Sequence, residues 1–336
     1  MNAHDPLVSI VTPVYNGEKY LAECIDSVLA QTYRHWDYTI VNNRSTDKSL
    51  EIAEKYARKD NRIRVRNYDE FVTVIESYNR ALRAISPSSK YCKVVSADDW
   101  IESDCLAQMV RVAEAYPTAA IIGSYQRCGG KVLGEGLPSN VEFLSGREVS
   151  RLSLLSLGFP KTLDAFGTQT SVLYRSDVIR KNDPFFPHLF PYADTTACYK
   201  YLQHHDFGFV HRALSIMRLH DDTVSSKIAD KYGMGLVGSL EHIIEYGPVF
   251  LEKNELEGLE NRFLRKYYKS MGANLLKLNW ERKVWSYQIS RMQELGYRIS
   301  FWKLIKGAAE EVAEELHDPR MAFRKFFRAL ERRVSR

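Results

Sequence analysis

The stretch VSIVTPVYNGEKYL, residues 8–21, decides the fold of the N-terminal part of the chain. The apolar run at residues 7–11 is rich in β-branched side chains and is typical of a buried strand. A polar turn follows at residues 12–17, and apolar residues then recur at helical spacing: Leu21, Ile25, Val28 and Leu29. The pattern therefore predicts a strand, a turn and a helix, with Asn16 as the N-cap of the helix.

The same alternation continues to about residue 125. Further strands are predicted at residues 38–41, 63–66, 91–95 and 119–122, with helices between them at residues 50–57, 74–85 and 106–113. Ser45 or Thr46 is expected to cap the second helix. Strand–helix alternation favours a parallel sheet with helices on both faces. Loops that leave the carboxyl ends of such strands share one edge, where ligands bind. We therefore expect three polar loops to meet there, at residues 12–16, 42–46 and 98–99.

Composition and charge narrow the class of protein. The 336 residues are 45% apolar and 26% charged, which is ordinary for a globular protein. The net charge of +5 suits an anion such as a nucleotide diphosphate or a lipid headgroup, and it is too small to argue for nucleic acid. The five cysteines contain no C-x-x-C pair and are expected as reduced thiols. The N-terminus has no signal-peptide pattern and no apolar run is long enough for a membrane span, so we expect a cytoplasmic protein.

Asp98 and Asp99 directly follow a predicted buried strand. Two adjacent carboxylates repel each other, and a divalent cation held between them and substrate phosphates would explain the pair. A helix cap for the helix that starts near Asp104, or simple solvation of a loop, is the alternative. Neither of the Gly-rich phosphate-binding motifs, G-x-G-x-x-G and G-x-x-x-x-G-K-[ST], follows a strand. A dehydrogenase or a P-loop enzyme is therefore disfavoured.

Residues 8–21 also resemble the opening of the family 2 glycosyltransferases, which have the GT-A fold. Other features resemble that family in order and spacing: Gln31-Thr32-Tyr33, Asn43-Arg44-Ser45-Thr46-Asp47 at the usual D-G-S-T-D, Asn79, Ala97-Asp98-Asp99 at the D-x-D-type site, Tyr192-Ala193-Asp194 at the E-D motif, and Arg218-Leu219-His220 at R-x-H. The resemblance covers about residues 7–225. It implies an α/β GT-A-type nucleotide-sugar-binding sheet flanked by helices and followed by a mainly helical C-terminal region. The expected domains are residues 1–230 and 231–336.

The resemblance implies a role for each matching residue. Thr12, Pro13 and Tyr15 would line the nucleotide, Asn42 or Asn43 would face the base, and Asp98 would contact ribose or metal. Asp99 would ligate Mn²⁺ or Mg²⁺, with His220 near the diphosphate or in the metal shell, and Asp194 would be the general base. A single carboxylate base, with no second one as covalent nucleophile, suggests displacement with inversion. The implied activity is transfer of a sugar from a nucleotide diphosphate, with UDP favoured, to a glycan or lipid-linked acceptor in surface polysaccharide assembly.

Three departures from the family pattern keep alternatives open. Asn42-Asn43 replaces the usual acidic pair, Ser96 replaces the first acid of D-x-D, and Ala193 replaces the acid before Asp194. An asparagine carbonyl can still accept the N3–H of uracil. A catalytically silent nucleotide- or glycan-binding module remains an alternative, as does a sugar nucleotidyltransferase, although the missing basic phosphate loop argues against the latter. Asp194 could also serve only as a helix N-cap.

The C-terminal end predicts a basic amphipathic helix. Its apolar face comprises Phe323, Phe326, Phe327, Leu330 and Val334, and its other face is rich in arginine and lysine from Arg320 onward. Such a helix can lie on an anionic membrane surface, or its apolar stripe can pack on the body of the protein or on a second subunit of a homodimer. Nearby aromatic residues could be core or could line an acceptor groove: Trp280, Trp285, Tyr287, Tyr297 and Trp302.

Overall fold

The computed structural model describes residues 5–157, 163, 165–187, 192–219, 233–276 and 281–317. The chain divides into two compact units, Met1–Thr223 and Val224–Arg336. His220 and the predicted basic helix from Arg320 onward lie outside the described residues. No helix within the described ranges is both long enough and apolar enough to span a bilayer.

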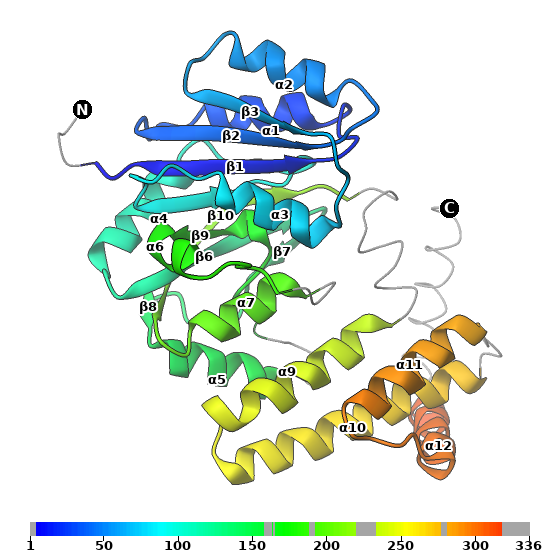
Figure 1. Cartoon of the computed structure of the whole chain (residues 1–336). Coiled ribbons are helices and arrows are strands. Elements are labelled where there is room, and N and C mark those ends of the chain that lie inside the picture. The colour runs from blue at the N-terminus through cyan, green and yellow to red at the C-terminus, as the bar shows by residue number, and fades with distance from the viewer. Residues whose placement is uncertain are drawn as a thin grey trace. The chain divides into compact units, whose positions relative to one another are not determined.

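The first unit is built on one sheet (Figure 1). Its strands are β1 Val8–Val14, β2 Trp36–Asn43, β3 Ile63–Tyr68, β4 Tyr91–Val94, β5 Trp100–Ile101, β6 Ala119–Cys128, β7 Lys131–Leu133, β8 Phe143–Leu144, β9 Val172–Arg175 and β10 Asp206–Met217. Its helices are α1 Leu21–Leu29, α2 Ser49–Ala57, α3 Val74–Arg83, α4 Cys105–Ala115, α5 Gly146–Ser156, the 3-10 turn η1 Gln169–Ser171, α6 Ser176–Lys181 and α7 Ala193–Tyr201. The strand order is β3-β2-β1-β4-β9-β6-β10-β5, with β7 beside β6 and β8 beside β10.

The sheet is mixed, so the predicted parallel arrangement holds for four neighbouring strands and not for the whole sheet. Strands β3, β2, β1 and β4 are parallel neighbours, as the alternating pattern predicted. Strand β9 is antiparallel to both β4 and β6 and separates them. The physical reason is that β9 follows a long excursion of the chain and returns from the opposite direction, which hydrophobic periodicity alone does not reveal.

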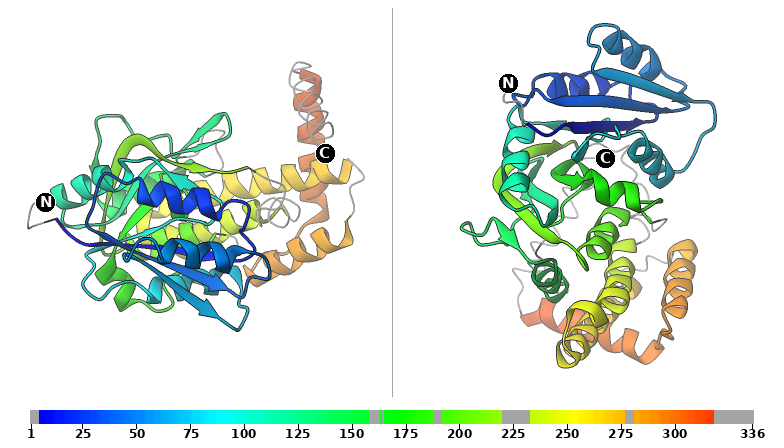
Figure 2. Two further views of the ribbon diagram at one scale, coloured as in Figure 1. Left: turned by 90° about the horizontal axis from the view of Figure 1, so that it is seen from above. Right: turned by 60° about the vertical axis from the view of Figure 1, so that its left-hand side comes forward.

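The core of this unit lies between the sheet and its helices. It includes fully buried residues of β1, α1 and α4, among them Ile10, Ile25 and Leu106. All five cysteines are buried and free, as expected. The two views of Figure 2 show β1, β2 and β3 side by side at one edge of the sheet, with α1 and α2 beside them. This packing fixes the strand ends from which the candidate site is built.

The second unit is helical, with α9 Met234–Phe250, α10 Lys253–Leu276, α11 Arg282–Glu294 and α12 Phe301–His317. Helices α10 and α12 approach closely at two glycines. A Cβ on Gly272 would lie 2.5 Å from the backbone nitrogen of Ala308, and one on Gly307 would lie 2.4 Å from the carbonyl oxygen of Tyr268. Only glycine therefore permits this crossing. Trp285 is buried and Trp302 is exposed, so the aromatic residues of this region are not all core residues.

Candidate functional site

The turn after β1 joins the loop after β2. Asn16 has a φ of 50°, and its side-chain oxygen accepts the backbone N–H of Thr46 at 2.8 Å. The backbone N–H of Asn16 donates to Ser45 Oγ at 3.0 Å. Asn16, Ser45 and Thr46 are therefore not helix caps, since α1 and α2 begin after Tyr20 and Lys48 without side-chain caps. Their polar groups instead hold the two loops together. Each loop supplies a side-chain oxygen that accepts a backbone N–H of the other loop.

The three residues predicted to line the nucleotide differ in exposure. Thr12 is fully buried: its hydroxyl donates to the carbonyl oxygen of Val95 at 2.8 Å and accepts from Tyr38 at 2.8 Å. Pro13 is also buried. Tyr15 is 51% exposed and packs on Phe71, also 50% exposed, with ring centroids 4.7 Å apart. The rings of Tyr15 in this turn and Phe71 after β3, together called the aromatic pair, are therefore open to a planar ligand.

Asn42 and Asn43 are buried and already hydrogen-bonded within the protein. Asn42 donates to the side-chain oxygen of Asn67 at 2.7 Å. Asn43 donates to the carbonyl oxygen of Val72 at 2.9 Å and accepts the Val72 N–H at 3.0 Å. This two-way contact needs a donor and an acceptor on one side chain, which asparagine has and aspartate lacks. Asn43 thereby holds the segment that carries Phe71.

The Asp98-Asp99 loop adjoins the turn after β1. A Cβ on Gly17 would lie 3.6 Å from the Cβ of Ala97, and the thiol of Cys24 in α1 donates to the carbonyl oxygen of Ser96 at 3.5 Å. The structure thus brings all three predicted loops to one edge of the sheet. The topology explains this, since β1, β2 and β4 run parallel and end on the same side.

Asp99 is 5% exposed, whereas Asp98 is partly exposed. Asp99 accepts hydrogen bonds from the Thr170 hydroxyl at 2.7 Å and from the backbone N–H of Arg218 at 3.2 Å. Burial, and after it the charge of Asp98, raises the pKa of Asp99 from 3.8 to about 7. The two carboxylates form an acidic pair whose repulsion a bound cation would relieve.

Arg218 closes one side of this acidic pair. Its Nε donates to the carbonyl oxygen of Asp98 at 3.1 Å, and its guanidinium forms an ion pair with Glu23 of α1. The guanidinium carbon lies 4.5 Å from the ring centroid of Tyr20 and 4.7 Å from that of Trp100. A planar cation stacked on two rings is held in one orientation. Arg218 therefore places a fixed positive charge beside Asp98 and Asp99.

Asp194 lies in the first turn of α7, where it accepts the backbone N–H of Thr195 at 2.8 Å. The residue that caps the helix is Tyr192, so the N-cap alternative for Asp194 is wrong. The charge of Asp194 acts on Tyr78 of α3, which lies beside the loop that carries the acidic pair. Its hydroxyl is 2.9 Å from Ser96 Oγ, and burial raises its pKa, with the charges of Asp98, Asp99 and Asp194 adding to the rise. The charges of the three carboxylates therefore all act on one partly buried hydroxyl, although the residues come from distant parts of the sequence.

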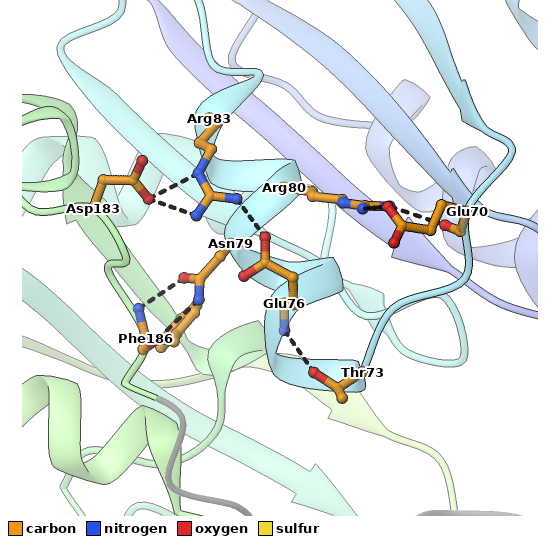
Figure 3. Close-up of polar contacts among 8 residues, drawn as sticks. All are labelled: Glu70, Thr73, Glu76, Asn79, Arg80, Arg83, Asp183 and Phe186. Carbon is orange, nitrogen blue, oxygen red and sulfur yellow. Dashed lines mark hydrogen bonds and ion pairs between the residues drawn. The ribbon is translucent and has the colours of Figure 1, made fainter.

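Helix α3 connects the aromatic side of the site to the segment before α7 (Figure 3). Thr73 caps its first turn, one residue after the Val72 backbone that Asn43 holds. Asn79 holds the backbone of Phe186 through two hydrogen bonds of 2.9 Å, donating from Nδ2 and accepting at Oδ1. Arg83 binds Asp183 at 2.8 Å in the same segment. The helix thus braces the segment that contains Asp183 and Phe186, and it begins directly after the segment that carries Phe71.

The residues at this edge fit a divalent cation. Asp98 and Asp99 offer carboxylate oxygens, the donors that Mg²⁺ and Mn²⁺ prefer, and Asp99 is buried beside a second acid. In the part of the chain that the structure describes, no three His, Cys, Asp or Glu side chains group as a metal site. The third predicted ligand, His220, lies outside that part.

Several residues of this site were missed by sequence reasoning. Phe71, Tyr78 and Thr170 gave no local signal, because each reaches the site through tertiary contacts. Lys93 is different, because a single lysine within the apolar strand YCKVV is unusual and can be recognised in the sequence.

Comparison with known proteins places this chain in a family. The sequence profile described as Glycosyl transferase family 2 matches residues 9–182, more than half of the chain. Glycosyltransferase GlyA of Streptococcus pneumoniae is 33% identical over 36% of this chain and 17% of its own length. TuaG of Bacillus subtilis, named for teichuronic acid biosynthesis, is 33% identical over 31% of this chain and 41% of its own length. The chain therefore spans less than half of either relative.

Solved structures share the fold. S. aureus TarS 1-349 in complex with UDP-GlcNAc has a TM-score of 0.61 at 18% identity, covering 91% of this chain and 88% of that one. Mannosyltransferase PcManGT from Pyrobaculum calidifontis, in complex with GDP-Man and Mn²⁺, has a TM-score of 0.57 at 14% identity, covering 93% and 89%. The chain belongs to glycosyltransferase family 2. The predicted fold class, a GT-A-type sheet with flanking helices and a helical C-terminal region, is confirmed.

Proposed function

We propose that this family 2 member is a metal-dependent inverting glycosyltransferase that moves a sugar from a nucleoside diphosphate, with UDP favoured, to a hydroxyl acceptor. The observation that carries the proposal is the acidic pair, Asp98 and Asp99, at the sheet edge where the three loops meet, with the charge of Asp194 also acting on Tyr78 beside Ser96. A transferase of this kind needs carboxylates for a cation on the donor diphosphate and a separate carboxylate for the acceptor. Membership of family 2 supports the same reading.

The donor would lie along the edge formed by the three loops. The aromatic pair would stack on the base, because an exposed ring binds any base through its face. Asn43 would act through the loop it holds, since both of its polar groups are engaged with Val72. Asn42, Thr12 and Pro13 would likewise shape the base site from below. These buried residues would set the position of the rings rather than touch the nucleotide with their side chains.

Asp98 and Asp99 would hold Mn²⁺ or Mg²⁺, with the donor phosphates and His220 as further ligands. A divalent cation there supplies Lewis-acid stabilisation of the charge that develops on the leaving diphosphate. Arg218 would add a fixed positive charge beside the same oxygens, which the rings of Tyr20 and Trp100 orient before the donor binds.

Asp194 would accept the proton of the acceptor hydroxyl as that oxygen attacks the anomeric carbon. The new bond forms between the acceptor oxygen and this carbon while the bond to the diphosphate oxygen breaks, so the configuration inverts. Attack from the side opposite the diphosphate fits a base that comes from a separate element, α7, and not from the loop that carries the metal ligands. The acceptor is proposed to be a glycan or a lipid-linked glycan in surface polysaccharide assembly, because TuaG is named for teichuronic acid biosynthesis.

Calorimetric titration with UDP, GDP and dTDP, each with and without Mn²⁺, tests the donor half of the proposal. Metal-dependent binding of one nucleotide is expected. Absence of binding by all three, in protein with a cooperative unfolding transition, refutes the donor site and favours the catalytically silent module.

The acceptor half is tested with Asp194→Asn. Transfer should be lost while nucleotide binding is unchanged, because the amide has no basic oxygen. Asp177→Asn is the matched control, since Asp177 is also an acid in the first turn of a helix, α6, and is paired with Arg175. Full transfer activity in the Asp194 variant would reject its role as the base.

A further inference from the structure

Lys93 in β4 is the only lysine with a buried side chain in the part of the chain that the structure describes, and it is 0% exposed. A charged group without water is stable only when its hydrogen atoms find acceptors. Its Nζ donates to the carbonyl oxygens of Thr170 at 2.6 Å and Val172 at 3.1 Å, and it lies 3.6 Å from Met109 Sδ. Three acceptors match the three N–H groups of an ammonium ion.

These contacts hold the 3-10 turn η1 against β4. Thr170 lies within η1, and Val172 begins β9 directly after it. The two carbonyl oxygens are buried and need donors, which Lys93 supplies from the neighbouring strand. An apolar residue at this position, typical of a buried strand, would leave them without this partner.

Thr170 carries the contact on to the acidic pair. Its hydroxyl accepts the backbone N–H of Ser96 at 3.1 Å and donates to Asp99 Oδ2 at 2.7 Å. A hydroxyl has one proton, so the Thr170 hydroxyl donates to Asp99 at 2.7 Å and not to Ser96 Oγ, which lies 3.1 Å away. Lys93 is thus linked to Asp99 through a single residue, with the carbonyl of Thr170 on one side and its hydroxyl on the other.

The departure at Ser96 makes this link more important. Where the family pattern has an acid, the hydroxyl of Ser96 lies 3.1 Å from that of Thr170 and 2.9 Å from that of Tyr78. The first acid is replaced by a group of neutral hydroxyls, so Asp99 carries more of any cation binding. Its orientation then depends on Thr170, whose 2.7 Å hydrogen bond to Oδ2 is shorter than the 3.2 Å hydrogen bond that Oδ1 accepts from the backbone N–H of Arg218.

We propose that Lys93 is a positioning residue for Asp99, acting through Thr170, and that this buried contact fixes the carboxylate in the direction of the divalent cation and the donor diphosphate. This inference rests on the proposed function. Burial lowers the pKa of Lys93, and the nearby Cys105, Cys92 and, last, Asp99 oppose that lowering. Groups behind a metal ligand typically change metal affinity about 10–100-fold when they are removed.

The test measures the Mn²⁺ concentration that gives half-maximal UDP binding, by calorimetry on the full chain. Thr170→Val removes the hydroxyl but keeps the branched shape, and it should raise that concentration about tenfold. Thr170→Ser keeps the hydroxyl and should restore the wild-type value. Lys93→Met should match Thr170→Val and also lower the unfolding temperature. Lys90→Met, which removes an exposed lysine just before the same strand, is the control and should change neither quantity.

The outcomes distinguish failure of the proposed function from failure of the role of Lys93. Wild-type protein that binds no UDP with Mn²⁺ refutes the proposed function, and this inference falls with it. Wild-type binding together with unchanged Mn²⁺ dependence in Thr170→Val and Lys93→Met overturns the inference alone, because a merely structural lysine would lower only the unfolding temperature. Should Lys93→Met not fold, Lys93→Gln is measured in its place, since it keeps donor groups without the charge.

Discussion

Asp99 should lower the stability of the metal-free protein at high pH, and Asp99→Asn should remove that cost. The native pKa is about 7 and the ordinary value is 3.8. Between these values the native state holds a proton that the unfolded state has lost, so the free energy of unfolding falls as the pH rises. The difference between about 7 and 3.8, at about 1.36 kcal/mol for each pKa unit, amounts to ~4 kcal/mol above pH 7.

Asparagine keeps the shape and carries no charge, but it has one acceptor oxygen where Asp99 accepts from both Thr170 and Arg218. Allowing about 1–2 kcal/mol for the lost acceptor, Asp99→Asn should be more stable than wild type by ~2–3 kcal/mol at pH 8. The advantage should vanish near pH 4, because the native carboxyl is protonated there and the unfolded one, with a pKa of 3.8, is about half protonated. Urea unfolding in EDTA, followed by circular dichroism from pH 4 to 8, measures the difference. The same variant should lose Mn²⁺-dependent UDP binding.

Asp60→Asn is a control with the opposite sign. A hydrogen bond from Arg62 lowers the pKa of Asp60, so that carboxylate contributes stability above pH 3.8 that is lost as the pH falls. Asp60→Asn should therefore weaken the protein near neutral pH, and the loss should shrink in acid. If Asp99→Asn were no more stable than wild type at pH 8, or gained equally at pH 5 and pH 8, the reasoning from burial and like charge would be refuted.

Three further predictions concern other residues. Arg218→Lys should weaken Mn²⁺-dependent UDP binding about tenfold in calorimetry, because an ammonium lacks the planar face that stacks on Tyr20 and Trp100. Unchanged affinity would contradict this. Tyr15→Ala should cost UDP binding ~1–3 kcal/mol through lost stacking, with no change in the urea midpoint because the ring is half exposed. A lower midpoint with normal binding would assign the ring to packing instead. Burial lowers the pKa of His242 from 6.5 to about 4, so wild type should lose ~3 kcal/mol of stability between pH 6.5 and pH 4 relative to His242→Leu. Parallel urea-midpoint curves for the two proteins over that range would disprove it.

The arrangement of the site was predictable where it follows from topology. Alternating apolar and polar segments indicated the parallel strands β1, β2 and β4, and parallel strands place their following loops on one edge. The same reasoning could not place β9, because the direction in which a strand returns is set by tertiary packing. The contact of Thr170 with Asp99 depends on β9 and η1, so it was out of reach as well.

Local polar residues were harder to interpret than apolar ones. Asn16, Ser45 and Thr46 are suitable helix caps by residue type, yet they bind each other across two loops. A cap and a cross-loop contact use the same oxygen atoms, so residue type alone does not distinguish them. The choice is made by the adjoining strands, which bring the two loops within hydrogen-bonding distance.

The departures from the family pattern at Asn43 and Ser96 share a physical explanation. Each replaces a negative charge with a neutral group that is buried or partly buried, and each neutral group is hydrogen-bonded to another part of the fold. A carboxylate at 43 could accept the Val72 N–H but could not donate to the Val72 carbonyl oxygen. A carboxylate at 96 would add a third negative charge beside Asp98 and Asp99. Under the proposed function, loss of charge at these positions need not mean loss of activity, because the aromatic pair would bind the base and the remaining acids would bind the cation.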